Sequence, residues 1–173
     1  MVVKNTDQRS GDYSEMAQLY RPSHADRAYD LKYGFRDHRG GGRSSVRESI
    51  ARVAAGALAK QILADRFGTR ILSWVQSVET VDAVVDAPDA VTLEQVEASL
   101  VRCPDPVASA AMEAAILKAR GDGDSVGGIV RLWIEKPPAG VGEPVFDRLE
   151  AELAKAMLSI PATKGFEFGS GFA

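Results

Sequence analysis

The segment Arg21–Arg52, RPSHADRAYDLKYGFRDHRGGGRSSVRESIAR, joins a polar, glycine-rich stretch to the longest helical pattern of the chain. It places His24, beside Asp26, ahead of three consecutive glycines and a Ser-Ser pair, with arginines throughout. Glycines let a backbone approach a ligand closely, and the first turn of a helix offers unpaired N–H groups at the positive end of its dipole. Arginine adds a permanent charge and forked hydrogen-bond donors. The segment therefore predicts a phosphate site with a titratable group nearby.

Outward from this segment, helical and extended patterns alternate loosely, which favours an α/β or α+β sandwich. A capping box, Ser45-x-x-Glu48, and apolar residues at four-residue spacing predict a helix that ends near Phe67–Gly68. In the strand that follows, Leu72, Trp74 and Val78 are expected mostly on one face. Residues 5–43 are expected to be loop with short helical pieces. The other predicted elements are helices over 92–101, 106–120 and 144–160 and strands over 1–3, 69–80, 126–136 and 165–169.

Length and charge limit the classes of function. The chain has 173 residues, of which 45% are hydrophobic, so it can bury a core, and we predict a single domain, 1–173. The net charge is −3, but residues 1–52 carry ten Lys/Arg against seven Asp/Glu. Positive charge near the glycines favours a local anion site. Because the whole chain is negatively charged and only this stretch is basic, we expect neither a nucleic acid nor a membrane as partner.

Cysteine content and the apolar pattern bear on the compartment. One cysteine, Cys103, excludes an internal disulfide and favours a reducing cytoplasm. The start has no apolar signal segment, and no apolar run reaches the length of a bilayer span. We therefore expect a cytoplasmic location.

The candidate anion site consists of Arg39, Arg43 and Arg47 with the N–H groups and hydroxyls of Ser44 and Ser45. The alternative is a glycine hinge before a helix that carries solvated arginines. A P-loop is excluded because the pattern G-x-x-x-x-G-K-[ST] is absent.

His24 is the candidate proton donor or acceptor, because imidazole titrates near neutral pH. A lone histidine is more often structural, and His38, between Asp37 and Arg39, is no weaker a candidate on local grounds. Two histidines and one cysteine, widely separated, do not form a zinc motif, so we expect no metal.

Taken together, these segments resemble chorismate synthase. The matching strings occur in the family's order, run through nearly the whole chain and are less distinctive only over about 69–123. They are NTDQRS (5–10), RPSHAD (21–26), KYG (32–34), RGGGRSS (39–45), RVAAG (52–56), DSVGG (124–128), GEPVFDRL (142–149) and SIPATKGFEFGSGF (159–172).

The resemblance implies a fold and a reaction. The fold would be a β-α-β sandwich, with inner helices between antiparallel sheets, of which this chain forms a central portion, and the assembly a homotetramer. The reaction would be a lyase reaction of the shikimate pathway, toward the aromatic amino acids: 5-enolpyruvylshikimate 3-phosphate loses phosphate and a proton by 1,4-anti elimination to give chorismate. Reduced FMN (FMNH2) is the required cofactor, and NADP is also associated with the family.

The resemblance also implies roles for single residues. His24 corresponds to the family's second catalytic histidine, which is proposed to protonate the reduced flavin. Arg43, Ser44 and Ser45 correspond to an FMN contact. A further FMN contact, made through the backbone, corresponds to Pro161 and Ala162. Arg39 and Arg47 are plausible phosphate partners.

The chain departs from the family pattern in several places. Arg27-Ala28-Tyr29 stands where the family has Tyr-Thr-Tyr, and His38 replaces the usual aromatic residue before R-G-G-G. The family's Gly-Glu-Ser-His-Gly string, with the first catalytic histidine, and its Asn-His-Ala-Gly-Gly string are absent from this sequence. We therefore expect a central fragment with little or no activity by itself. The alternative is a fragment that binds FMN or phosphate without catalysis.

Overall fold

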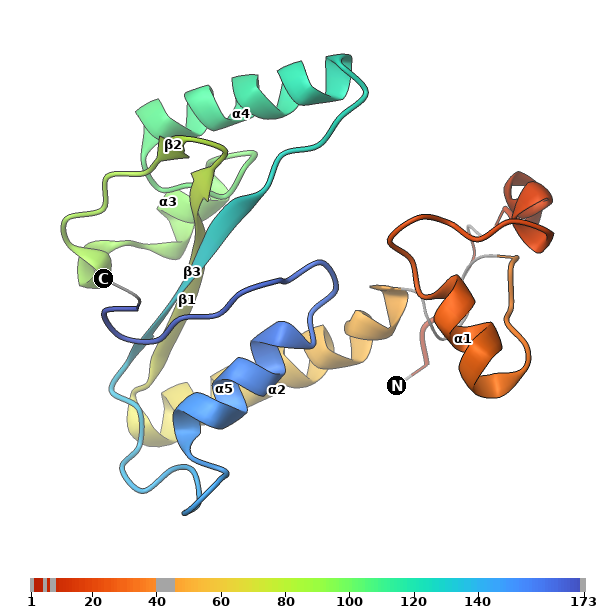
Figure 1. Ribbon diagram of the computed structural model, residues 1–173. Coiled ribbons are helices and arrows are strands. Elements are labelled where there is room, and N and C mark those ends of the chain that lie inside the picture. The colour runs from red at the N-terminus through yellow and green to blue at the C-terminus, as the bar shows by residue number, and fades with distance from the viewer. Residues whose placement is uncertain (1, 5, 7–8, 40–45, 172–173) are drawn as a thin grey trace. The chain divides into compact units, whose positions relative to one another are not determined.

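The computed structural model describes residues 2–4, 6, 9–39 and 46–171. The chain divides into two compact units, Met1–Ala57 with Val141–Ala173 (unit 1) and Leu58–Gly140 (unit 2) (Figure 1). Helices accompany a three-stranded antiparallel sheet, which confirms the predicted α+β class. That residues 1–173 form a single domain stays a prediction.

Unit 2 is built on a sheet with the strand order β2-β1-β3 (Figure 1). Strand β1, Arg70–Val78, pairs along its whole length with β3, Gly128–Glu135, and at one end with β2, Val81–Asp82. The strands predicted over 69–80 and 126–136 are thus confirmed within two residues at each end. The short strand β2 lies in a stretch where no strand was predicted.

A β-bulge at Gln76 interrupts the pairing of β1 with β3. Val75 lies opposite Val130, but the next paired residue is Ser77, opposite Ile129. An extra residue shifts the alternation of side chains between the two faces. The expectation that Leu72, Trp74 and Val78 share one face is therefore wrong for Val78, which joins a different part of the core.

Two apolar clusters form the core of unit 2. Leu72 and Trp74 pack with Val91 and with Val96 of α3, Leu93–Glu97. The second cluster includes Met112 and lies under α4, Pro106–Gly121, which contacts β1 and β2 (Figure 1). Its buried members are Val78, Ala83, Cys103, Ala108 and Met112.

Local sequence signals set the helix ends of unit 2. The Thr92 side chain and the Gln95 side chain form a complete capping box at the start of α3. Asp105 accepts hydrogen bonds from the N–H groups of Val107 and Ala108 at 2.9 and 3.1 Å, and Pro106 opens α4 as predicted. Helix α3 ends earlier than predicted, because the chain turns back where the Ser99 hydroxyl accepts the N–H of Cys103. A 3-10 turn, η4, covers Pro88–Ala90.

Unit 1 holds short helical elements: η1 (Ser10–Tyr13), η2 (Glu15–Ala17), α1 (Asp26–Tyr33), η3 (Val46–Glu48) and α5 (Leu149–Leu158). Helix α2, Ser49–Phe67, begins in unit 1 and continues into unit 2. It ends as predicted, at a left-handed Gly68 with φ +67°. The predicted cap Ser45 lies outside the described residues.

Three predictions for unit 1 are wrong. The helix expected from residue 144 begins only at Leu149, because a tight turn precedes it, in which Glu143 N–H donates to the carbonyl of Asp147 at 2.8 Å. No strand forms among the described residues of 2–4 or 165–169. The strand at 165–169 was predicted from a stretch with glycine at each end. A strand also requires a neighbouring strand to pair with, and a local sequence pattern does not show whether one is present.

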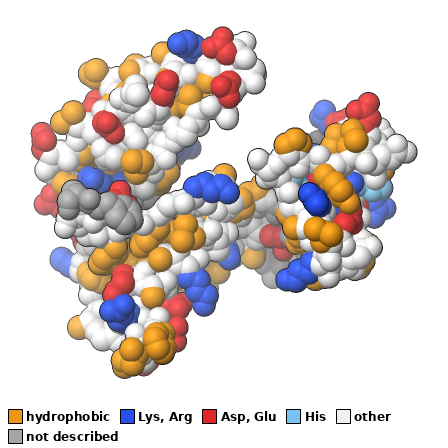
Figure 2. Space-filling model, viewed as in Figure 1, with side chains coloured by type: hydrophobic (Ala, Val, Ile, Leu, Met, Phe, Trp, Pro, Cys, Tyr) orange, Lys and Arg blue, Asp and Glu red, His pale blue; other side chains and the backbone are white. Residues whose placement is uncertain are grey.

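Apolar side chains along α2 and in unit 1 are largely exposed. Ile50, Leu58 and Ile62, which form the predicted stripe of α2, are 46, 63 and 44% exposed, and no residue of α2 is buried. Figure 2 shows hydrophobic side chains at the surface over α5. In the described part of unit 1 a single residue, Asp26, is buried. The one buried side chain in this part of the chain is therefore charged.

The two halves of α4 differ in their expected effect on stability. Met112 is fully buried, whereas Leu117 on the same helix is 55% exposed. We expect Met112→Ala to lower the free energy of unfolding of unit 2 by about 2–5 kcal/mol, since it leaves a cavity. Leu117→Ala should change it by about 0.5 kcal/mol. Both tryptophans, Trp74 and Trp133, lie in unit 2, so urea unfolding followed by their fluorescence measures it; equal effects of the two substitutions would contradict this packing.

Candidate functional site

Asp26, the first residue of α1, is the centre of the candidate site. It is 3% exposed, and its two carboxylate oxygens are held by one arginine. Arg21 Nε donates to Oδ2 at 2.8 Å and Arg21 Nη2 to Oδ1 at 3.0 Å, while the backbone N–H of Arg21 also reaches Oδ2, at 3.3 Å. Such a forked pair fixes the direction of both side chains.

His24 lies against this pair. Its Nδ1 is 3.0 Å from Asp26 Oδ1 and 3.1 Å from Arg21 Nη2. The side chain is 28% exposed, so part of the ring remains open to solvent. Figure 2 shows a histidine at the surface of the N-terminal segment, next to basic side chains. The arrangement leaves one nitrogen, Nε2, without a role in the contacts with Asp26 and Arg21.

The backbone before His24 is strained. Ser23 has φ +57°, a left-handed conformation that residues other than glycine, asparagine and aspartate adopt rarely. Such a residue costs on the order of 1–3 kcal/mol and persists only where its surroundings hold it. The contacts of Arg21 and His24 with Asp26 lie on either side of Ser23 and supply that restraint.

Arg36 closes the cluster from the far end of α1. Its side chain is 8% exposed and its Nε donates to Asp30 Oδ2 at 3.1 Å. Nη2 donates to the carbonyls of Met16 and Leu19 at 2.5 and 3.0 Å. Nη1 is buried and lies 3.5 Å from Asp26 Oδ1, an ion pair without a hydrogen bond. One guanidinium thus joins three parts of the segment, and the sequence pattern did not indicate it.

Apart from His24, the formal charges of this Asp26 cluster cancel: two arginines, Arg21 and Arg36, face two aspartates, Asp26 and Asp30. Hydrogen bonds from Arg21 hold the pKa of Asp26 well below its usual range, and they outweigh the opposing effect of burial. Asp26 therefore stays ionised near neutral pH.

Of the predicted arginines, Arg39 and Arg47 are solvent-exposed. Arg39 donates from Nε and Nη2 to the two carboxylate oxygens of Asp37, at 2.9 and 3.2 Å, and this pair lowers the pKa of Asp37. Arg47 lies in η3. Arg43, Ser44 and Ser45 lie outside the described residues, so their position near His24 stays a prediction.

Pro161 and Ala162 form a turn after α5. Thr163 N–H donates to the carbonyl of Ile160 at 3.2 Å, and Ala162 has φ +69°, where glycine is usual. Within the described part of the chain, no acceptor takes the N–H of Ala162, and the residue is exposed. A ligand could therefore contact this backbone. Among described residues, no hydrogen bond or ion pair joins the turn to His24.

Arg52 in α2 fixes the start of this turn, and sequence reasoning did not single it out. Its Nη1 donates to the Ser159 hydroxyl at 2.5 Å, and that hydroxyl donates to the carbonyl of Ala156 at 2.6 Å. The side chain thus links the RVAAG string to the SIPAT string. The recurrence of both strings in the resemblance was the available signal.

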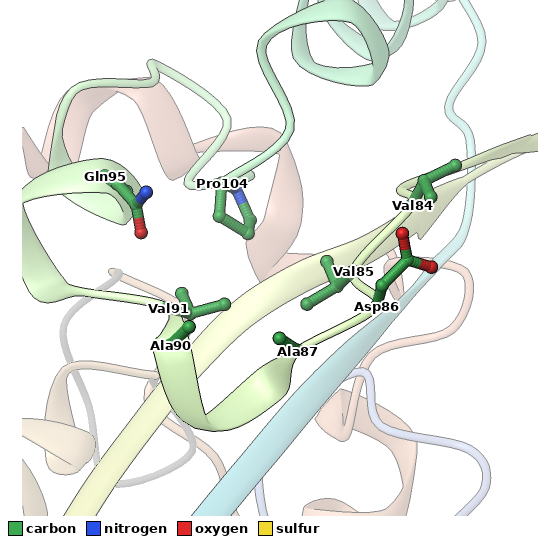
Figure 3. A pocket seen from close by; sticks show the side chains of 8 residues that line it. All are labelled: Val84, Val85, Asp86, Ala87, Ala90, Val91, Gln95 and Pro104. Carbon is green, nitrogen blue, oxygen red and sulfur yellow. The ribbon is translucent and has the colours of Figure 1, made fainter.

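Unit 2 contains a small pocket of about 180 Å³ (Figure 3). Ligand pockets usually enclose roughly 300–1,000 Å³. Asp86 is the one charged residue of its lining, and the Gln95 carboxamide already accepts the N–H of Thr92. The other lining residues are Val84, Val85, Ala87, Ala90, Val91 and Pro104. The pocket does not contain the groups that the predicted chemistry needs.

Two absences hold for the residues that the structure describes. They contain no group of three or more His, Cys, Asp or Glu side chains placed to hold a metal ion. They also contain no helix with both the length and the apolar character needed to cross a bilayer.

The described structure defines a class of protein: an α+β protein with a charged cluster around one partly exposed histidine. The chain belongs to the chorismate synthase family, whose model matches residues 1–173. It is 57% identical over its whole length to the chorismate synthase of Acaryochloris marina and 58% identical to one from a Synechococcus species, of which it covers 47 and 46%. A crystal structure of chorismate synthase superimposes with a TM-score of 0.73 at 34% identity, over 86% of this chain and 48% of that one. The chain thus spans about half the length of these relatives.

The pKa of Asp26 predicts how acid affects the N-terminal segment. The unfolded carboxyl titrates near pH 3.9 and the folded one lower, so below about pH 5 the unfolded state binds more protons. Stability of the segment 9–39 should therefore fall as pH is lowered through this range, and the backbone amide resonances of Arg21 and His24 should report it. In Asp26→Asn this part of the acid sensitivity should be missing; an unchanged pH profile would contradict the assignment.

Proposed function

We propose that this chain contributes the central part of a chorismate synthase. The whole protein would eliminate phosphate and a proton from 5-enolpyruvylshikimate 3-phosphate, in the 1,4-anti sense, to give chorismate. The observation that carries the proposal is the family match over residues 1–173, supported by 57% identity to a relative across the entire chain. Because the chain spans about half of that relative, the activity is proposed for the whole protein.

Two described features support the cofactor that the proposal requires, reduced FMN, which would supply electron density transiently to the substrate as phosphate leaves. The cofactor offers acceptor oxygens and a site for a proton. Ala162 presents an exposed N–H in a left-handed turn, and His24 presents a partly exposed imidazole beside Arg21. We assign Pro161 and Ala162 to backbone contact with the flavin. Arg43, Ser44 and Ser45 are assigned to the same cofactor from the family motif.

His24 would hold the proton that balances charge at the cofactor. Its position next to Arg21 and Asp26 supports this role, because both neighbours orient the ring. The cluster around it is otherwise neutral, so a proton on His24 changes the local charge by a full unit.

Arg39 and Arg47 would stabilise the negative charge that develops on the leaving phosphate. Arg39 is paired with Asp37 two residues away, in an exposed geometry. Exposed pairs of this kind contribute roughly 0–1 kcal/mol. Exchanging Asp37 for a phosphate dianion would therefore cost little.

The assembly and compartment are proposals that follow from the family. We infer a homotetramer in the cytoplasm, with a small-molecule substrate and without a nucleic acid or membrane partner. The exposed apolar stripe of α2 supports a partner surface, because large exposed apolar patches usually mark interfaces. NADP is proposed only through its association with the family.

A second candidate function is binding of FMN or phosphate without catalysis. Two observations favour it for this chain taken alone. It spans about half of its relatives, and its only histidines are His24 and His38. The two candidates differ in turnover but share the cofactor site, so two separate measurements are needed.

Turnover separates the two candidates. We expect the 173-residue chain, given reduced FMN and 5-enolpyruvylshikimate 3-phosphate, to release little or no phosphate, because it spans about half of the length of its relatives. The Acaryochloris marina relative, measured in the same assay, provides the positive control. Phosphate release by the chain at a rate comparable to that relative would refute the expectation.

Cofactor binding tests the site itself. We expect the chain to quench FMN fluorescence, and Arg43→Ala to weaken binding by about 10- to 100-fold, because a hydrogen bond to a charged group contributes roughly 1.5–3 kcal/mol. Arg120→Ala, an exposed arginine at the end of α4, is the matched control and should bind as the unsubstituted chain does. No quenching at high micromolar FMN, or equal losses in both variants, would count against the assigned site.

A further inference from the structure

We propose that Asp26 is a positioning residue for His24: it keeps the imidazole proton on Nδ1 and leaves Nε2 as the nitrogen that exchanges protons with a bound ligand. The proposal rests on the proposed function for the identity of that ligand. The tautomer itself follows from the contacts of the cluster.

Three atoms form a nearly equilateral triangle. Arg21 Nη2 lies 3.0 Å from Asp26 Oδ1, His24 Nδ1 lies 3.0 Å from the same oxygen, and Nη2 and Nδ1 are 3.1 Å apart. The two N–H bonds of a guanidinium nitrogen diverge widely in the plane of the group. Seen from Nη2, Asp26 Oδ1 and His24 Nδ1 lie too close together for the two diverging N–H bonds to point at both. Nη2 therefore makes a well-directed hydrogen bond to only one of these two atoms.

Whether Nη2 donates to Asp26 Oδ1 or to His24 Nδ1 depends on the tautomer of His24. If Nδ1 carried no proton, its lone pair would face the carboxylate oxygen at 3.0 Å, and two acceptors would repel. If Nδ1 carries a proton, it donates a charge-assisted hydrogen bond to Oδ1, while Nη2 donates to that same oxygen. In the second arrangement both nitrogens donate to Oδ1, and the 3.1 Å contact between Nη2 and Nδ1 carries no hydrogen bond. We assign this arrangement because the charge-assisted bond to the carboxylate outweighs the approach of the two donors.

The remaining charges keep the proton of Nδ1 in place. Arg36 Nη1 lies 3.5 Å from Asp26 Oδ1, and Arg36 is in turn paired with Asp30 at 3.1 Å. With two guanidinium groups around it, the Asp26 carboxylate stays ionised and does not take the imidazole proton. When the imidazolium gives up its Nε2 proton to an acceptor, the neutral ring keeps Nδ1–H. Reprotonation at Nε2 restores the starting state, and Asp26 is unchanged throughout.

The backbone supports the same role. Ser23 is held at φ +57° directly before His24, and Asp26 starts α1 two residues after it. Two restraints, one on each side, therefore set the plane of the ring. A carboxylate that served only to stabilise the fold would not need to contact Nδ1 as well as Arg21.

The test reads the tautomer directly in the 15N-labelled 173-residue chain, through long-range 1H–15N correlations of the imidazole rings at about pH 8, where model histidines are neutral. With only His24 and His38 in the chain, His38→Gln assigns the signals. We expect His24 as the Nδ1–H form. Asp26→Asn should shift it toward the Nε2–H form, whereas the control Asp30→Asn, whose carboxylate pairs with Arg36, should not.

Two results would overturn the proposal: an Nε2–H tautomer in the unsubstituted chain, or an unchanged Nδ1–H tautomer in a folded Asp26→Asn variant. Should Asp26→Asn fail to fold, the tautomer of the unsubstituted chain still decides the question. The measurement needs no flavin. Its failure would leave the FMN titration untouched, and a failed FMN titration would leave the tautomer assignment intact.

Discussion

The buried carboxylate of Asp26 is the interaction on which the described N-terminal segment depends. No apolar residue is buried in the described part of unit 1. The segment 9–39 is therefore held together by ion pairs and by contacts between arginines and tyrosine rings. Arg21 and Arg36 both contact Asp26, and the same guanidinium groups lie over Tyr13 and Tyr20 at 5.8 and 4.9 Å from the ring centroids. Removing one partner from a buried ion pair typically costs about 3–5 kcal/mol.

The two units therefore differ in what stabilises them. Unit 2 packs a bulged antiparallel sheet against α3 and α4 through two apolar clusters. The segment that carries His24 is held by polar contacts and has no such apolar cluster among its described residues. Regions with few buried apolar contacts usually unfold locally at a lower free energy than the core. Both residues assigned to ligand contact lie in unit 1 near strained backbone. His24 follows the left-handed Ser23, and Ala162 is itself left-handed. That association is typical of binding sites.

Features with a local cause were predictable from the sequence. Gly68 ends α2, Thr92 and Gln95 cap α3, and Asp105 with Pro106 opens α4, because each acts within one helical turn. Features that need a distant partner were not. The bulge at Gln76 moves Val78 to another cluster, and the expected strand at 165–169 has no partner among the described residues. In the site, His24 and Asp26 adjoin in sequence, but the role of Arg36 depends on a fold of the chain back to residues 16–19.

Amide hydrogen exchange tests most directly whether one buried carboxylate orders this segment. The amides of Tyr29 and Gly34 are bonded within α1, to the carbonyls of Ala25 and Asp30, whereas the amide of Val75 is bonded in unit 2. With Asp26→Asn, we expect amide exchange at Tyr29 and Gly34 to become faster, while Val75 keeps its protection. Equal protection of the α1 amides in both chains would contradict the account.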